Sequence, residues 1–565
     1  MSLLGSIQLG ANSLRVNQLA LHVVGQNIAN ANTPGYIREE AILTPAPTER
    51  RGGVLLGMGV RIEAVVQKLD RFLEERLRAA ASDRADVETR ENVYAKLEGV
   101  LGELGDTDLS SALGNFFSSI SEILNQPEDL GVRNLAVLNG STLATEIRAI
   151  RRHVGQLSSE VTDRIIDAND RINRLLEEIR ALNVRIVHTE AGDISSSDAV
   201  GLRDQRLKAL EQLAEIIDVR VTEESNGSVV VYCGSSFLVH GGERRAVEVV
   251  LDSDRGFVTA EVHLDATEAP LESTSGELQG LLTAQNDILG GFLQQLDDFA
   301  KALIFEFNKQ FSRGQGLTGY DALTSEFAVE DAGAALDRAG LEYVPQNGSF
   351  QVLVYDERSG LTQTTDVIVD LNGVGDDMTL ADLAAALDAV EGISAAVTLQ
   401  GELSVASETP DRQFAFAGDT SGVLAALGLG GFFTGRSAWD IGVSEAISED
   451  PARFAASLSG FGTDTDNAAL LAVLADTALE SQQGVSLNEL YDLLIGTTAE
   501  NGSVNQALAE SARVFEATLR GQKAATSGVN LDEEAIRMIG YQQAYQATAR
   551  YISTLAELME MLVQL

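Results

Sequence analysis

The sequence is poor in cysteine and histidine, the residues that most often build metal and redox sites. Its single cysteine, Cys233, excludes an intramolecular disulfide and a cysteine-based metal cluster. The five histidines show no metal-ligand spacing and no arrangement typical of nucleophilic catalysis: His22, His153, His188, His240 and His263. We therefore expect no cofactor, no resident metal and no enzymatic activity.

Basic residues are also scarce. There are 41 Lys and Arg against 84 Asp and Glu, which gives a formal net charge of -43, and no lysine lies between Lys309 and Lys523. Such a surface repels phosphate backbones, so nucleic acid is excluded as a partner. Residues 1–80 are an exception, with nine basic and seven acidic residues. A near-neutral end on an acidic chain predicts that this end is buried against another surface.

Long hydrophobic runs are absent. The uncharged apolar stretch near 421–435 is shorter than the roughly 20 residues that span a bilayer. Residues 2–14 are uncharged but interrupted by polar residues and glycine, which is untypical of a cleavable signal peptide. We expect no membrane contact, and any export would use a route without a cleaved signal.

Helical periodicity is clearest at the two ends of the sequence. Residues 3–29 predict a helix that ends at Asn32-Thr33-Pro34-Gly35, and residues 38–60 predict an extended linker. Residues 531–565 predict a second helix, with apolar residues at alternating spacings of three and four. The seam residues are Leu4, Ile7, Leu14, Leu21 and Ile28 in the first helix, and Met538, Tyr541, Tyr545, Ile552, Leu555, Met559 and Leu562 in the second. Because a lone helix with so narrow a seam is marginal in water, we expect the ends to pair with each other and with neighbouring subunits as a coiled coil.

The middle of the chain alternates between helical and strand patterns. Helices are predicted at 67–104, 143–186, 198–217, 276–311, 451–460, 463–481 and 503–526. Asn226-Gly227 predicts a hairpin turn, and a short helix after Thr379 has a capping-box partner in Asp382. The predicted fold class is multidomain and mainly α, with terminal coiled-coil helices, a long-helix bundle with a β-hairpin region, and an inserted α+β domain. The predicted domains are residues 1–60 with 527–565, residues 61–335 with 436–526 (β region at about 218–268), and residues 336–435.

One short stretch is similar to a calcium-binding loop. Residues 370–381 begin with Asp, Asn and Gly at suitable positions, but Val374 and Ala381 stand where ligands belong. The EF-hand interpretation therefore fails, and a weak cation site near Asp376 is left open.

Two end motifs resemble a known family. The stretch Asn27-Ile28-Ala29-Asn30-Ala31-Asn32-Thr33-Pro34-Gly35-Tyr36 is similar to the signature of the flagellar axial family of rod, hook and hook-associated proteins. The stretch Ser527-Gly528-Val529-Asn530-Leu531-Asp532-Glu533-Glu534-Ala535 resembles the hook-associated branch, since rod and hook proteins usually carry a shorter Val-Asp-Leu variant. Asp204-Gln205-Arg206 agrees with that branch, whereas Phe311 departs from it.

The resemblance implies a secreted, extracellular structural subunit of the bacterial flagellum, exported through the type III apparatus with an export chaperone. It implies a ring of identical copies at the hook–filament junction that is required for filament attachment. Hook protein would lie below this ring, and a second junction protein and the flagellin filament above it. The alternatives are a distal rod or hook subunit of the same family, or a secreted enzyme or adhesin with flagellar-type ends. No catalytic pattern in residues 345–435 favours the last alternative.

Overall fold

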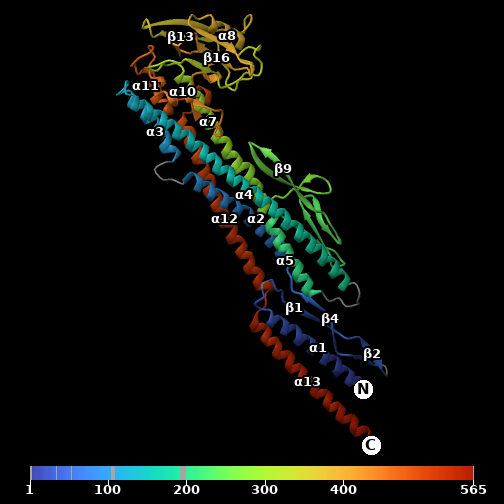
Figure 1. Ribbon diagram of the computed structural model, residues 1–565. Helices are drawn as coiled ribbons and strands as arrows, with labels where there is room; N and C mark the ends of the chain where they lie inside the picture. Colours follow the sequence, from blue (N-terminus) through green and yellow to red (C-terminus); the bar gives the residue numbers. More distant parts are fainter. Residues whose placement is uncertain (1–2, 34, 52–53, 103–107, 191–198, 564–565) are drawn as a thin grey trace. The chain divides into compact units, whose positions relative to one another are not determined.

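The computed structural model describes residues 3–33, 35–51, 54–102, 108–190 and 199–563 (Figure 1). The chain forms two compact units, each built from separate segments. Unit 1 contains Met1–Val93, Ser158–Asn286 and Ser503–Leu565, and unit 2 contains Tyr94–Leu157 and Asp287–Gly502. Long helices and several small antiparallel sheets confirm a multidomain, mainly α fold.

The two ends of the chain pack together within unit 1. Helix α1 (Leu3–Ala29) and helix α13 (Leu531–Val563) lie side by side (Figure 1). Both agree closely with the predicted helices, because three-to-four spacing runs along their whole lengths.

The predicted linker is wrong, since residues 38–60 are largely paired strands. Strand β1 (Glu39–Pro45) pairs antiparallel with β4 (Val60–Gln67), and β2 (Thr48–Arg51) pairs with β3 (Val54–Gly57). Side chains on both faces of β1 are partly exposed, so the alternation of apolar and polar residues that marks a half-buried strand is missing.

The helical part of unit 1 draws on four helices: α2 (Arg71–Gly102), α4 (Leu130–Glu190), α5 (Val200–Ile216) and α12 (Leu487–Ser527). The apolar stripe of α4 is buried as predicted, with Ile165, Ile172 and Ile179 fully buried. Three positions of that spacing, Ile150, Leu157 and Leu175, are only half-buried, whereas Leu176 is fully buried.

Two antiparallel sheets complete unit 1. Strands β5 (Arg220–Glu223), β6 (Val229–Cys233), β7 (Ser236–His240) and β8 (Glu243–Arg244) form one sheet, and β9 (Val247–Asp254), β10 (Phe257–Leu264) and β11 (Ala269–Pro270) form the other. The Asn226-Gly227 hairpin is confirmed, with Gly227 at a φ of 86°.

The predicted helix at 276–311 is interrupted. It consists of α6 (Glu277–Thr283), a π-helical turn at Ala284–Leu289 and α7 (Gly290–Phe311). In unit 2, α7 and α3 (Leu109–Ile123) contribute rings to an aromatic core. Its members are Phe116, Phe117, Phe307, Phe311, Phe432, Phe433 and Phe454.

The α+β part of unit 2 contains two three-stranded sheets. One has the order β14 (Leu361–Val369), β13 (Gly348–Asp356), β17 (Arg412–Ala417), and the other β12 (Ala322–Thr324), β16 (Leu403–Ser407), β15 (Ile393–Val397). Helix α8 (Leu380–Asp388) begins with the predicted capping box, and α9 (Val423–Leu427) follows the sheets. The core of this part includes Tyr320 and Val329, so it begins before residue 336.

The segment between 433 and 486 is less helical than predicted. It contains the short pair β18 (Phe433–Thr434) and β19 (Gly442–Val443), helices α10 (Glu445–Glu449) and α11 (Asp466–Ala472), and 3-10 turns at Pro451–Arg453, Leu474–Asp476 and Glu480–Gln482. Asp464 accepts bonds from the backbone of Leu458 and Ser459, which replace helical bonds there. Within the described part of the chain, no helix is long and apolar enough to cross a membrane.

Candidate functional site

The two end motifs meet in a buried polar cluster of unit 1. The side-chain amide of Asn27, near the end of α1, donates to Glu534 Oε2 (3.1 Å) and to the carbonyl oxygen of Glu39 (2.9 Å). Its carbonyl oxygen accepts bonds from the Tyr36 hydroxyl (2.9 Å) and from the Glu39 backbone N–H (2.9 Å). Asn27 thus uses its side chain to join three segments of the chain, and both it and Glu534 are buried.

Arg38 supplies the cation of this cluster. Its guanidinium lies 2.7 Å from Glu534 Oε1 and 3.2 Å from Glu533 Oε2. Its backbone N–H donates to the carbonyl oxygen of Ser527 at the end of α12 (3.1 Å). Because Arg38 and Glu534 are both buried, each satisfies a charge that would be costly to leave alone. We call Asn27, Arg38 and Glu534 the end clamp.

Acidic groups beside the end clamp have shifted pKa values. Burial raises the pKa of Glu39, and burial with the nearby Glu39 carboxylate raises that of the Tyr36 hydroxyl. Burial, followed by the charge of Glu39, raises the pKa of Asp204 to about 6. The Asp204 carboxylate accepts a hydrogen bond from Gln67 in β4. The family stretch at Asp204 is therefore part of the same neighbourhood as the N-terminal motif.

Other residues of the N-terminal motif shape the end of α1. Asn30 donates to the carbonyl oxygen of Gln26 (3.0 Å), and Thr33 donates to the Asn30 side chain (3.3 Å). Gly35 has a φ of 82°, in the left-handed region that glycine enters at little cost. Asn32 is exposed, and Pro34 lies outside the described residues.

The C-terminal motif forms the break between α12 and α13. Asn530 caps α13, since its side-chain oxygen accepts from the backbone of Asp532 (3.0 Å). Gly528 lies where a side chain would meet the carbonyl oxygen of Ala524 at 2.3 Å, so this close turn requires glycine. Val529 is half-buried, and Leu531 is exposed. The predicted site residues end at Glu533, whereas the residue of this stretch that the fold buries is the next one, Glu534.

The predicted seam residues of α13 form its least exposed stripe. Met538, Tyr541, Tyr545, Ile552 and Met559 are half-buried. Leu555 is only 8% exposed. Leu562 lies in α13, but its side chain is outside the described part.

The stripe that α1 buries differs from the predicted seam. Ile7, Leu14, Leu21 and Ile28 are only half-buried, and of Leu4 the structure describes the backbone alone. A more buried row follows spacings of four and three and consists mostly of small and polar residues: Ser6, Gly10, Ala20, Val24 and Asn27 are buried, and Ser13 and Asn17 are half-buried. Val16 and Val23, beside this row, are also buried. This spacing was present in the sequence, but hydropathy does not mark it.

Gly10 shows why this row is small. A Cβ atom placed on Gly10 would lie 2.7 Å from Ile552 Cγ1 of α13. Helix α13 therefore approaches α1 at a distance that only glycine allows. The wider apolar side chains of both helices are left partly exposed on the flanks. The exposed ones include Leu19, Ile536, Ile539, Tyr551, Leu558 and Met561.

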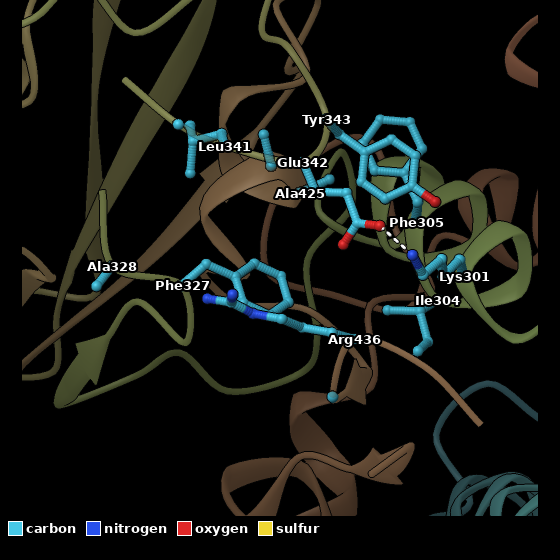
Figure 2. A pocket seen from close by; sticks show the side chains of 13 residues that line it. Lys301, Ile304, Phe305, Phe327, Ala328, Leu341, Glu342, Tyr343, Ala425 and Arg436 are labelled. Carbon is cyan, nitrogen blue, oxygen red and sulfur yellow. Dashed lines mark ion pairs between the residues drawn. The ribbon is translucent and has the colours of Figure 1, made fainter. Parts of the chain in front are cut away.

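Unit 2 contains a small cavity of about 100 Å³ (Figure 2). Figure 2 shows Phe305 and Tyr343 stacked, with ring centroids 3.7 Å apart, beside the ion pair of Lys301 and Glu342 (2.5 Å). The Arg436 guanidinium lies over the ring of Phe327. Stacking and pairing occupy these groups, so the cavity offers no arrangement of nucleophile and base.

The open cation site also gains no support. Asp377 accepts an ion pair from Arg338 (3.1 Å) and a hydrogen bond from the backbone of Gly373 (2.8 Å). Among the residues that the structure describes, no group of three or more His, Cys, Asp or Glu side chains is arranged to hold a metal ion.

Comparisons with known families agree with these observations. Residues 94–325 match the family described as flagellar hook-associated protein FlgK helical domain. Residues 522–565 match the flagellar basal body rod FlgEFG protein C-terminal family, and residues 7–36 match the flagella basal body rod protein family. The last two matches contain the C-terminal and N-terminal members of the end clamp, Glu534 and Asn27.

Relatives that match this chain over its full length are named flagellar hook-associated protein 1. Flagellar hook-associated protein 1 of Escherichia coli (strain K12) is 24% identical, with 98% of each chain covered. Its namesake from Bacillus subtilis (strain 168) is 26% identical, covering 99% of this chain and 97% of the relative.

A solved structure has the same fold. It is that of the flagellar hook junction protein FlgK from Burkholderia pseudomallei, with a TM-score of 0.51 and 17% identity, covering 80% of this chain and all of that one. From the end motifs, the family matches and the full-length relatives together, the chain resembles flagellar hook-associated protein 1 over its full length, and it is a structural subunit of the bacterial flagellum.

Proposed function

We propose that this chain is the adaptor that polymerises at the hook–filament junction and retains the filament. The names of its full-length relatives support this role. The end clamp is the observation that carries the proposal. It joins motifs that lie 507 positions apart, and it thereby holds α1 and α13 as a preformed pair.

The assembly surface is the flank of that pair. Half-buried residues such as Leu14 and Leu21 on α1, and exposed residues such as Tyr551 and Leu558 on α13, leave apolar area facing water in a single copy. Burial against neighbouring copies would stabilise a ring by about 25 cal/mol for each Å² of apolar surface removed from water. Residues 1–60 with 527–565 are then the assembly domain. The predicted seam of α1 and the exposed flank of α13 are contacts between subunits, whereas the seam of α13 packs against α1 within each copy.

The same proposal assigns the partners. They are copies of this chain within the ring, hook protein below, and a second junction protein and flagellin above. The chain reaches the outside of the cell through flagellar export with the help of a chaperone. Its role is structural and non-enzymatic.

Electron microscopy of cells that lack this chain tests the proposal. We expect bare hooks, with flagellin released into the medium, and restored filaments after complementation with the unaltered gene. A rod or hook subunit would instead leave cells without complete hooks. Filaments that stay attached in the null strain would refute the junction role.

A further inference from the structure

A second cavity, of about 300 Å³, lies within unit 1 between the start of α2, helix α5 and the β5–β6 hairpin. Its volume is far above the roughly 10–15 Å³ that one water molecule requires. Leucine and valine side chains of α5 and the hairpin form one wall. Four arginines also line it: Arg71, Arg78, Arg203 and Arg206.

Three of the four guanidinium groups already have protein partners. Arg71 and Arg203 both pair with Glu223, at 2.5 Å from Arg71. Arg206 donates to the carbonyl oxygen of Gly227 (2.7 Å). These contacts hold the wall of the cavity in place and leave Arg78 as the exception.

Arg78 is only 8% exposed, yet within the described residues it makes no ion pair and no hydrogen bond, and its Nε is buried without an acceptor. The closest carboxylates do not supply one. Glu74 and Glu211 are both bound by Lys523, at 2.9 and 2.5 Å, and Glu75 is exposed. Burial lowers the pKa of Arg78 in spite of these carboxylates. The terminal nitrogens of the guanidinium are not shielded as Nε is, and because Arg78 lines the cavity, an acceptor placed inside it would meet their N–H donors.

The side chains at the mouth of the cavity are of the kinds found at the centres of protein–protein interfaces. Phe72 lines it and is 69% exposed, and the Arg76 guanidinium lies 5.7 Å from the centre of its ring. Exposed aromatic and arginine side chains around a pocket are the residues that most often dominate binding between proteins.

We propose that this cavity receives an acidic side chain from a neighbouring copy of this chain, with Arg78 binding the carboxylate and Phe72 covering it. The inference rests on the proposed polymer, in which copies are neighbours. Charge supports that occupant. With 84 acidic against 41 basic residues, a neighbouring copy presents many carboxylates, and two such copies attract each other only where one offers a free cation.

Crosslinking from the mouth of the cavity tests this inference. The only native cysteine, Cys233, is buried, and burial raises its pKa to about 12, so it is a poor target for thiol reagents. A Glu75→Cys variant, at an exposed position that lines the cavity, therefore accepts a maleimide–diazirine crosslinker at one defined position and leaves Phe72 and Arg78 in place. After illumination of isolated flagella, we expect a product of two copies of this chain, joined at a peptide that contains Asp or Glu.

Matched variants test the role of Arg78. In the Glu75→Cys background, Arg78→Gln should lower the yield of the two-copy product by roughly tenfold or more, and Arg78→Lys should restore part of it. Arg90→Gln makes the same chemical change on the same helix, at a residue that does not line the cavity, so the yield should persist. In the purified monomer, Arg78→Gln should keep or raise the melting temperature, because it removes an unpaired buried charge.

Several results would overturn the inference: no crosslink, a crosslink to another protein, an unchanged yield with Arg78→Gln, or a lower melting temperature of that monomer. The two proposals fail separately. Filament retention in the null strain would refute the junction role, whereas the crosslink reports on copies in whatever structure contains this chain.

Discussion

Asn27 and Glu534 lie 507 positions apart in the sequence and share a buried hydrogen bond of 3.1 Å. The same carboxylate binds Arg38 at 2.7 Å, so one glutamate of α13 holds both the end of α1 and the strand that follows it. Because all three side chains are buried, the end clamp depends on every member.

Replacing Glu534 with alanine should therefore release the terminal helices. The change leaves Arg38 buried without its main partner, and breaking a buried pair in this way costs about 3–5 kcal/mol. We expect much faster amide hydrogen exchange in α1 and α13 of the monomer. Glu533→Ala is the matched control, because the Glu533 side chain is 57% exposed and its pair contributes about 1 kcal/mol or less. Equal effects of the two variants would rule out the clamp.

Gly10→Ala and Gly25→Ala should have opposite effects within one helix. At Gly10 the new Cβ would lie 2.7 Å from Ile552 Cγ1, whereas at Gly25 no atom lies within 4 Å. Overpacking costs about 1–3 kcal/mol, and alanine gains up to about 1 kcal/mol over glycine in a helix. The melting temperature of the monomer should fall for Gly10→Ala and rise for Gly25→Ala. A rise for both would mean that α13 does not approach α1 so closely.

The sequence predicted the terminal helices but not how they face each other. Spacing of three and four gave the bounds of α1 and α13, because helix formation leaves a periodic signal. The contact stripe of α1 passes through Ser6, Gly10 and Ala20, which carry little hydropathy. Close packing of two helices requires small side chains at the contact. The large apolar residues of α1 therefore mark its partly exposed flank and not the stripe that contacts α13.

The end clamp was predictable only in part. The family resemblance included Asn27, Glu533 and Glu534, since all three lie in recognisable stretches, but it did not indicate which glutamate is buried. Arg38 gave no local signal, because a buried ion pair depends on two segments that meet only after folding. The β1–β4 pairing was missed for a similar reason. Both faces of β1 are partly exposed, so apolar and polar residues do not alternate clearly, and the two strands are joined by backbone hydrogen bonds that leave no pattern in the sequence.

Stability of unit 1 should depend on the protonation of Asp204. Burial and Glu39 raise its pKa from 3.8 to about 6, so the folded chain binds this proton more tightly than the unfolded chain does. The contribution to stability is complete below pH 4 and is lost as the pH rises through 6. Asp204→Asn should therefore raise the free energy of unfolding at pH 7 by about 1–2 kcal/mol, after allowing for partial exposure. It should also make this free energy depend less on pH between 4 and 7. Thermal melting between pH 4 and 7 measures this pH dependence, and Asp170→Asn, at an exposed position, is the control. Equal pH profiles of stability for the wild type and Asp204→Asn would contradict the prediction.

The last prediction separates contacts within one copy from contacts between copies. Leu555 is 8% exposed and belongs to the stripe that α13 buries, whereas Leu558, less than one turn away, is 42% exposed. Leu555→Asp places a carboxylate in the chain's own interface at a cost of several kcal/mol, so it should loosen α1 and α13 in the monomer. Leu558→Asp leaves the carboxylate in water in the monomer but buries it in a ring that covers this flank.

The measurements for this pair are hydrogen exchange on the purified monomer and filament retention after complementation of the null strain. Leu558→Asp should keep monomer protection and lose filaments, and Leu555→Asp should lose both. Glu557→Ala, at an exposed polar position between them, should lose neither. Attached filaments with Leu558→Asp would mean that this flank of α13 stays in water in the assembled flagellum, and the contact between copies would then have to involve other exposed apolar residues, such as Ile539 of α13 or Leu19 of α1.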